Sequence, residues 1–287
     1  MGGPGVSMPV LLVLGVGAFL AVVLRRRQVV NADPQTHPHL MRLARRSARA
    51  KAFGLGVGAA VALLVAVFVG DYGRGLLLAP TVLALGLAVS LFVGEVLVWR
   101  EARTPGVAAL ETRRPSAHLP RVLLGTTIVA VLVLAGLLGW ARDHQDNDPA
   151  SMTRGRGYLQ VFPSGWTISS PFPGDYYSMP LVWLGLAALL VAGVTLVVIA
   201  LRPRNGSDPQ VVAVDDVVRR RNAEATIATV LLGACGSLVP VALLMAIAVG
   251  RFNPTAGWLL VLVAALGIVG VGWAAAVLLV PDGGRRD

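Results

Sequence analysis

Seven stretches of the chain are each long and apolar enough to cross a membrane, and this feature limits the possible folds more than any other. A helix needs about 20 mostly apolar residues to span the hydrocarbon core of a bilayer. The stretches run roughly over 7–24, 52–69, 76–99, 122–140, 179–201, 227–249 and 257–280. The sequence therefore predicts an all-α polytopic bundle of about seven transmembrane helices, embedded in a lipid bilayer.

Basic residues are distributed unevenly between the loops that join these stretches. With the N-terminus outside, the inner loops hold 20 of the 25 lysine and arginine residues and the outer loops hold 5. Inner loops of membrane proteins carry such an excess of positive charge. The predicted orientation is N-out and C-in. The net charge of +10 is then a topology signal, and no nucleic-acid partner is expected.

Two segments of the chain share a pattern. "DPQTHPHLMRLARRSARA" occupies residues 33–50 and "DPQVVAVDDVVRRRNAEA" occupies residues 208–225, with seven identities in eighteen positions. Each is expected in an inner loop that leads into the next apolar stretch, and Asp215 or Asp216 is expected to cap the second helix. An internal duplication, with a parallel 3+1+3 arrangement of helices, follows from this placement.

The predicted domain plan is a single transmembrane domain over 1–287. Its parts are repeat 1 at about 1–100, a linking helix at about 120–140, an outer loop at 141–178 and repeat 2 at about 179–281.

The residues after the third stretch carry a resemblance. "GEVLVWREARTPGVAALETRR", together with the arginine-rich helix starts, resembles uncharacterised multi-pass membrane proteins of high-GC bacteria. The resemblance implies a multi-pass protein of a bacterial plasma membrane and carries no activity. In topology alone, the 3+1+3 plan is similar to that of sugar-carrying SWEET transporters. Their Pro-Gln pair lies inside a helix, whereas Pro209-Gln210 is expected in a loop here, and shared topology does not establish function.

Glu95 is the only ionisable residue that lies well within a predicted span. A charged group in the hydrocarbon core is costly and marks a functional site by default. Trp99 and Arg100 follow closely, so Glu95 lies near the inner membrane surface. Two interpretations stay open: Glu95 pairs with an arginine or reaches the headgroups, or it takes part in proton or ion coupling.

Pro240 lies in the middle of the sixth stretch, where it is predicted to kink the helix. Gly236 and Ser237 come just before it. Carbonyl groups freed by the kink, and the hydroxyl group, could line a cavity. The alternative is a kink that serves helix packing.

The loop at 141–178 begins with acidic residues and continues with aromatic ones. The acidic part, "RDHQDNDPAS", lacks the glycine and glutamate of a calcium-binding EF-hand loop, and no metal site is expected. "YLQVFPSGWTIS" predicts two short strands about a Pro-Ser-Gly turn. Such a hairpin would lie on the headgroups as part of the aromatic belt, or cover a cavity as a lid.

The function suggested by these patterns is not enzymatic. The sequence has no phosphate-binding loop, dinucleotide fingerprint or nucleophile motif, and no cofactor is expected. The predicted function is an accessory, sensory or scaffold component that acts through a protein partner. The candidate residues for docking a partner at the inner face are Arg45, Arg46, Arg220 and Arg221. The alternative is a small-solute transporter with a cavity between two three-helix repeats.

Overall fold

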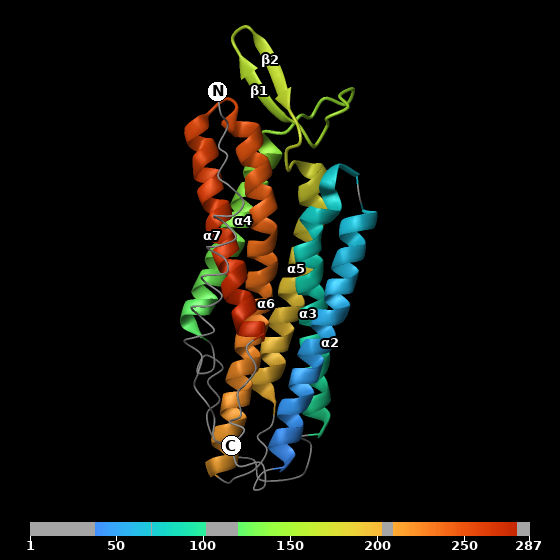
Figure 1. Cartoon of the computed structure of the whole chain (residues 1–287), viewed down its shortest axis with the longest axis vertical. Coiled ribbons are helices and arrows are strands. Elements are labelled where there is room, and N and C mark those ends of the chain that lie inside the picture. Colours follow the sequence, from blue (N-terminus) through green and yellow to red (C-terminus); the bar gives the residue numbers. More distant parts are fainter. Residues whose placement is uncertain (1–37, 70, 102–119, 203–208, 280–287) are drawn as a thin grey trace.

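The computed structural model describes residues 38–69, 71–101, 120–202 and 209–279, and Figure 1 shows that these form a mostly helical bundle with a small hairpin at one end. The helices are α2 (Pro38–Phe68), α3 (Arg74–Glu101), α4 (Arg121–Asp143), α5 (Asp175–Leu201), α6 (Pro209–Gly250) and α7 (Pro254–Leu279). A short turn, η1 (Asp71–Gly73), joins α2 to α3, and the strands are β1 (Tyr158–Phe162) and β2 (Gly165–Ser169).

Six of the predicted membrane-spanning stretches are confirmed as long apolar helices. Each of these six helices in the described residues has the length and hydropathy needed to cross a bilayer. The stretch at 7–24 lies outside the described residues, so the seventh helix stays a prediction.

Helix α6 lies at the centre of the bundle and contacts each of the other five described helices. It packs most extensively on α7, and α2 packs on α3 in a similar way. The two pairs are joined because α3 also packs on α6 and α5. The central position of α6 explains why polar residues of this helix end up buried between neighbours.

The helices have unequal lengths, so the two ends of the bundle differ. α6 has 42 residues, which corresponds to about 63 Å at 1.5 Å per residue. Figure 1 shows that α6, α2 and α3 extend beyond α4 and α7 at the end opposite the hairpin. We call this the charged end, because α5 finishes there next to buried ionic residues, and we call the other the hairpin end.

The start of α6 corrects the prediction for the second copy of the repeated segment. α6 begins at Pro209 rather than at the cap predicted at Asp215 or Asp216, so Pro209 and Gln210 are helical instead of lying in a loop. Asp215 therefore lies inside the helix and does not cap it. The helix continues past the apolar stretch because Asp215 pairs with Arg219, and Arg220 with Glu224, one turn apart.

The first copy of the segment is also partly helical, because α2 begins at Pro38 rather than near residue 52. Its residues 33–37 lie outside the described part of the chain. The duplication and the 3+1+3 plan therefore stay predictions.

The predicted hairpin is confirmed. β1 and β2 pair antiparallel, with Phe162 opposite Gly165, so that Pro163 and Ser164 form the turn. We call residues 144–174 the hairpin lobe. Figure 1 shows the strands projecting away from the helix ends, rather than lying flat across them.

Aromatic side chains fix the base of the hairpin lobe to the bundle. Tyr158 packs on Phe172, with ring centroids 5.2 Å apart, and on Phe252 of the α6–α7 turn at 6.0 Å. The guanidinium group of Arg156 lies 3.8 Å from the ring centroid of Tyr72, in the α2–α3 turn. The lobe therefore contacts both helical turns at this end.

Candidate functional site: a buried charge cluster

Five polar side chains from three parts of the chain meet at the charged end. Glu95 comes from α3, Arg202 directly follows α5, and Asp215, Arg219 and Asn222 come from α6. Each residue is at most 5% exposed. We call these five residues the charge cluster.

Arg202 is the central member of the charge cluster. Its Nη1 atom donates to Oε2 of Glu95 at 3.2 Å, and its Nη2 atom donates to Oδ1 of Asp215 at 2.7 Å. Arg219 donates from Nε to the other oxygen of Asp215 at 2.7 Å. Asn222 donates from Nδ2 to Oε1 of Glu95. Both carboxylates therefore have a donor on each oxygen.

The local sequence explains why these residues converge. Asp215, Arg219 and Asn222 are spaced by four and three residues, which places them along one side of α6. Arg219 also donates from Nη1 to the carbonyl oxygens of Ile199 and Arg202, at 3.2 and 2.9 Å. The last carbonyls of a helix lack partners within that helix. Arg219 thus satisfies the end of α5 and orders the backbone that carries Arg202.

The charges of the cluster balance. Two carboxylates face two guanidinium groups, and Lys51 of α2 adds a further favourable interaction with Glu95. Removing ionic groups from water costs several kcal/mol for each ion, which is offset only when the geometry and hydrogen bonding are good. In this cluster the pairs connect α3, α5 and α6, so the arrangement can hold three helices in one register.

The structure assigns Glu95 a definite environment. The sequence left open whether Glu95 pairs with a neighbouring arginine or carries a coupled proton or ion. Its two oxygens accept hydrogen bonds from Arg202 and Asn222, and the residue is 4% exposed. A side chain held in this way is an ionic contact between helices.

The residues near Pro240 pack against α3. Ser237 is fully buried and its hydroxyl lies 2.7 Å from that of Thr81. A Cβ atom at Gly236 would lie 2.7 Å from Cβ of Pro80, so the two helices approach closely at this glycine. α6 continues through Pro240 as one helix. These residues fill the α3–α6 interface, and the predicted kink angle stays a prediction.

The candidate docking arginines differ in their surroundings. Arg220 is exposed and its Nε atom lies 3.2 Å from Glu224, the pairing expected from their spacing. Arg221 is partly buried. The backbones of Arg45 and Arg46 belong to α2, but their side chains lie outside the described part of the structure.

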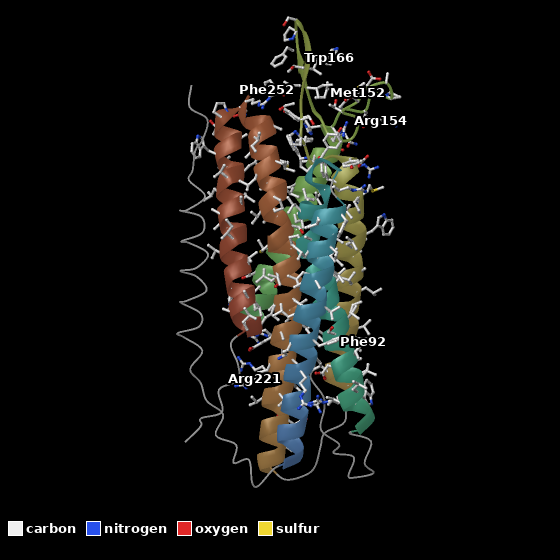
Figure 2. All side chains as sticks on the ribbon, turned by 45° about the vertical axis from the view of Figure 1, so that its right-hand side comes forward. Phe92, Met152, Arg154, Trp166, Arg221 and Phe252 are labelled. Atoms are coloured by element: carbon white, nitrogen blue, oxygen red, sulfur yellow. The ribbon has the colours of Figure 1, made fainter. Side chains whose placement is uncertain are left out.

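The hairpin carries apolar side chains on one face. Leu159 and Val161 of β1 lie opposite Ile168 and Trp166 of β2, and because side chains alternate along a strand, all four share a face. Val161 and Trp166 are each 69% exposed. Phe162, on the opposite face, packs on Phe252 with ring centroids 6.0 Å apart. We call the four-residue surface the apolar hairpin face; Figure 2 shows Trp166 beyond the helix ends.

Asp146 organises the base of the hairpin lobe. Its Oδ2 atom accepts from the Thr153 hydroxyl at 2.7 Å, and its Oδ1 atom accepts from the Asp148 N–H at 3.1 Å. Burial would raise the pKa of this carboxyl, but hydrogen bonds from Ser151, Thr153 and Asp148 outweigh burial and lower the pKa. Its oxygens are therefore used within the lobe, and no metal-binding group of three or more ligands occurs in the described residues.

Sequence reasoning missed four members of the charge cluster. Arg202 and Arg219 were interpreted as topology signals, Asp215 as a helix cap, and Asn222 was not considered. One available signal is the spacing of Asp215 and Arg219, which places opposite charges on one helix face next to an apolar stretch. The contact with Glu95, 107 residues before Arg202, has no signal in a single sequence.

Comparison of the chain with protein families, with curated proteins and with solved structures finds no match.

Proposed function

We propose that this polytopic protein is an accessory or scaffold component of a membrane complex, and that it contacts its partner through the apolar hairpin face. The observation that carries this proposal is the exposure of Val161 and Trp166, at 69% each, on strands that project clear of the helices. Exposed apolar patches on soluble parts of proteins are typical of interaction sites. Tryptophan is also the residue type that contributes most often to binding energy at interfaces.

The interior of the bundle supports a scaffold more than a transporter. A transporter of 3+1+3 type would need a polar cavity near the middle of the bundle, beside Gly236 and Ser237. At that position α3 and α6 are in direct contact through Pro80 and Thr81. The buried charges of the charge cluster, at the charged end, are paired with one another, which favours a fixed arrangement of helices.

The proposal includes the orientation derived from the loop charges. In it, residues 7–24 form a seventh helix, the hairpin end faces the outside of a bacterial plasma membrane, and the charged end faces the cytoplasm. The partner then has an extracytoplasmic surface that accepts an apolar side chain as large as tryptophan. Arg220 and Arg221 lie at the opposite end and serve as a second candidate contact.

A site-specific photo-crosslinking experiment tests the contact. A benzophenone amino acid replaces Trp166 in one variant and Met152 in a second, and cells are irradiated before purification. Met152 is the matched control because it is 89% exposed in the same lobe but lies outside the apolar hairpin face. We expect one discrete cross-linked product from position 166, and its loss when Val161→Ser is added.

The proposal fails if position 166 gives no product, or if positions 152 and 166 give the same set of products. Size-exclusion chromatography of the Val161→Ser variant is the folding control. This variant should elute like the wild type, because Val161 contributes little buried surface.

A further inference from the structure

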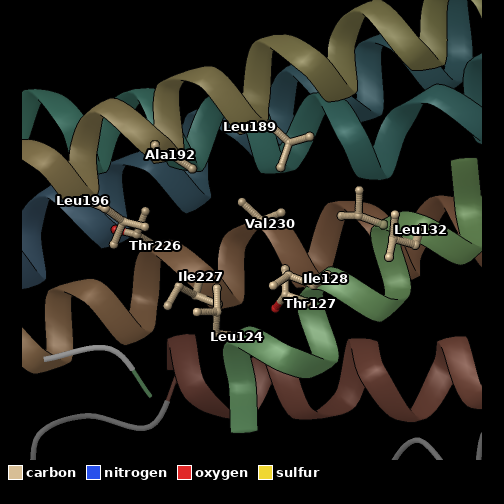
Figure 3. A pocket seen from close by; sticks show the side chains of 12 residues that line it. Leu124, Thr127, Ile128, Leu132, Leu189, Ala192, Leu196, Thr226, Ile227 and Val230 are labelled. Carbon is tan, nitrogen blue, oxygen red and sulfur yellow. The ribbon is translucent and has the colours of Figure 1, made fainter. Parts of the chain in front are cut away.

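An apolar groove runs between α4, α5 and α6 on the side of the bundle (Figure 3). α4 and α5 scarcely touch each other, whereas α4 packs extensively on α6. A wedge of about 260 Å³ therefore remains between them. Its walls include Leu124, Ile128 and Leu132 of α4, Leu189 and Leu196 of α5, and Ile227 of α6.

The groove offers almost no polar partner to a ligand. Its two hydroxyl groups belong to Thr127 and Thr226, and each already donates to the carbonyl oxygen four residues earlier, at 2.8 Å. A ligand with hydrogen-bonding groups along its length would leave those groups unpaired, which is costly. An apolar chain has no such cost, so the walls select for hydrocarbon.

The groove opens toward the surface that faces lipid. Leu132 is 65% exposed and Ile128 is 51% exposed, and both lie within an apolar helix long enough to span a bilayer. Hydrocarbon chains of the surrounding lipid therefore reach the groove without crossing any of the described helices.

Positive charge lies at one end of this groove. Arg121, Leu124, Ile128 and Leu132 are spaced by three or four residues and share one stripe of α4. Arg121 is exposed, and no ion pair of its side chain is recorded among the described residues. On α6, Arg220 lies seven residues before Ile227 and therefore on the same side of that helix. It is about 10 Å closer to the charged end than Ile227.

We propose that the groove binds one acyl chain of an anionic phospholipid, whose phosphate group lies at Arg121 and Arg220. The apolar walls hold the chain, and the two guanidinium groups at the charged end select a negative headgroup. Arg220 is partly neutralised by Glu224, so Arg121 supplies the larger share of this selectivity. Arginine suits this role because its planar group forms paired hydrogen bonds with phosphate.

Gly193 allows a direct test of the groove. It lies in the wall, and a Cβ atom added there would meet no other atom within 4 Å. Gly193→Leu therefore fills the groove without disturbing the helices. Gly185→Leu is the matched control, because Gly185 is on the same helix, is equally free of neighbours and lies outside the wall residues.

The measurement is native mass spectrometry of the purified full chain, titrated with phosphatidylglycerol. We expect the first lipid to bind about tenfold more weakly, or worse, to Gly193→Leu, because several methylene groups lose their contacts. Gly185→Leu should bind like the wild type. Equal affinity of the two variants for phosphatidylglycerol would overturn the proposal.

A second titration tests the headgroup. Arg121→Gln should weaken binding of phosphatidylglycerol about fivefold, since each basic residue near an anionic membrane contributes about that factor. Phosphatidylcholine has the same phosphate, but its choline cation compensates the charge, so its binding should weaken less than that of phosphatidylglycerol. Arg154→Gln, which removes one exposed charge at the hairpin end, should change the binding of neither lipid. If Arg121→Gln weakens the binding of both lipids equally, Arg121 does not select a negative headgroup, and if it weakens neither, Arg121 does not contact the phosphate. Either result would overturn the proposal.

Discussion

Arg202 is the residue on which the charge cluster depends most, because it bridges two carboxylates that have few other donors. We expect Arg202→Met to lower the free energy of unfolding by about 3–5 kcal/mol, the usual cost of leaving buried charges unpaired. Unfolding by denaturant in mixed micelles would measure the change. Arg202→Lys should recover only part of the loss, because an ammonium group cannot reach Glu95 and Asp215 at once.

Arg220→Met is the control for this prediction. Its side chain is 65% exposed and pairs only with Glu224 within the described residues, so the expected change is within about 0.5 kcal/mol. Similar losses in Arg202→Met and Arg220→Met would mean that the charge cluster contributes no more than a surface ion pair.

The lowered pKa of Asp146 determines how the hairpin lobe is expected to respond to acid. Its pKa in the folded lobe is lower than the ordinary value of 3.8. The ionised Asp146 carboxylate therefore stabilises the folded lobe fully above that value, and this stabilisation is lost as the pH falls through the folded pKa. The Asp148 amide donates to the Asp146 carboxylate, and the Gly155 amide donates to the Asp146 carbonyl oxygen at 2.8 Å. We expect hydrogen exchange at both amides, corrected for intrinsic rates, to accelerate below about pH 4.

Asp146→Asn tests the cause. In this variant the Asp148 and Gly155 amides should exchange faster than in the wild type at neutral pH. Their exchange rates, corrected for intrinsic rates, should no longer depend on acidification. A wild-type lobe that stays equally protected from pH 6 to pH 3 would contradict the role given to this carboxyl group.

At the scale of elements, α3 and α6 approach each other closely at two glycines of α6, Gly233 and Gly236. A methyl group at Gly236 would overlap Cβ of Pro80, whose ring cannot move away. We expect Gly236→Ala to destabilise the bundle by about 1–3 kcal/mol in the same unfolding assay. Gly139→Ala in α4 meets no atom within 4 Å and should be neutral or slightly stabilising. A Gly236→Ala variant as stable as the wild type would show that α3 and α6 are farther apart than in this structure.

The sequence predicts the positions of helices better than it predicts their ends or their contacts. Apolar length locates the spanning parts of the six described helices, since the bilayer sets that length independently of packing. It does not locate the start of α6, because charged and polar residues interrupt residues 209–226. This part of the chain becomes helical through pairs such as Asp215–Arg219 and through contacts with α5. The hairpin was predictable because alternation and a turn are both local signals.

The candidate site was predictable only in part. The rarity of an acid within an apolar stretch singled out Glu95. The partners of Glu95 were not identified, because arginines near a membrane surface also set topology and the two roles give the same pattern. The groove beside α4 has no sequence signal, since it arises from how two apolar helices diverge on a third.

At the scale of the whole molecule, the orientation can be tested with single cysteines. Cys235 is the only cysteine and is buried, so Cys235→Ala gives a cysteine-free background. An impermeant maleimide added to intact cells should label Ser164→Cys, in the exposed hairpin turn. It should label Arg220→Cys only after the membrane is permeabilised. The reverse result would show that the charged end faces outward.

The long sequence separation within the charge cluster also has a consequence for biosynthesis. Glu95 leaves the ribosome 107 residues before Arg202 and 127 residues before Asn222. At translation rates of about 5–20 residues per second, α3 waits roughly 5–20 seconds for its ionic partner. During that interval the carboxylate has to remain at the headgroups, in the insertion machinery or in its protonated form. Final placement of α3 is therefore a late event, completed only once α5 and the first turns of α6 have been made.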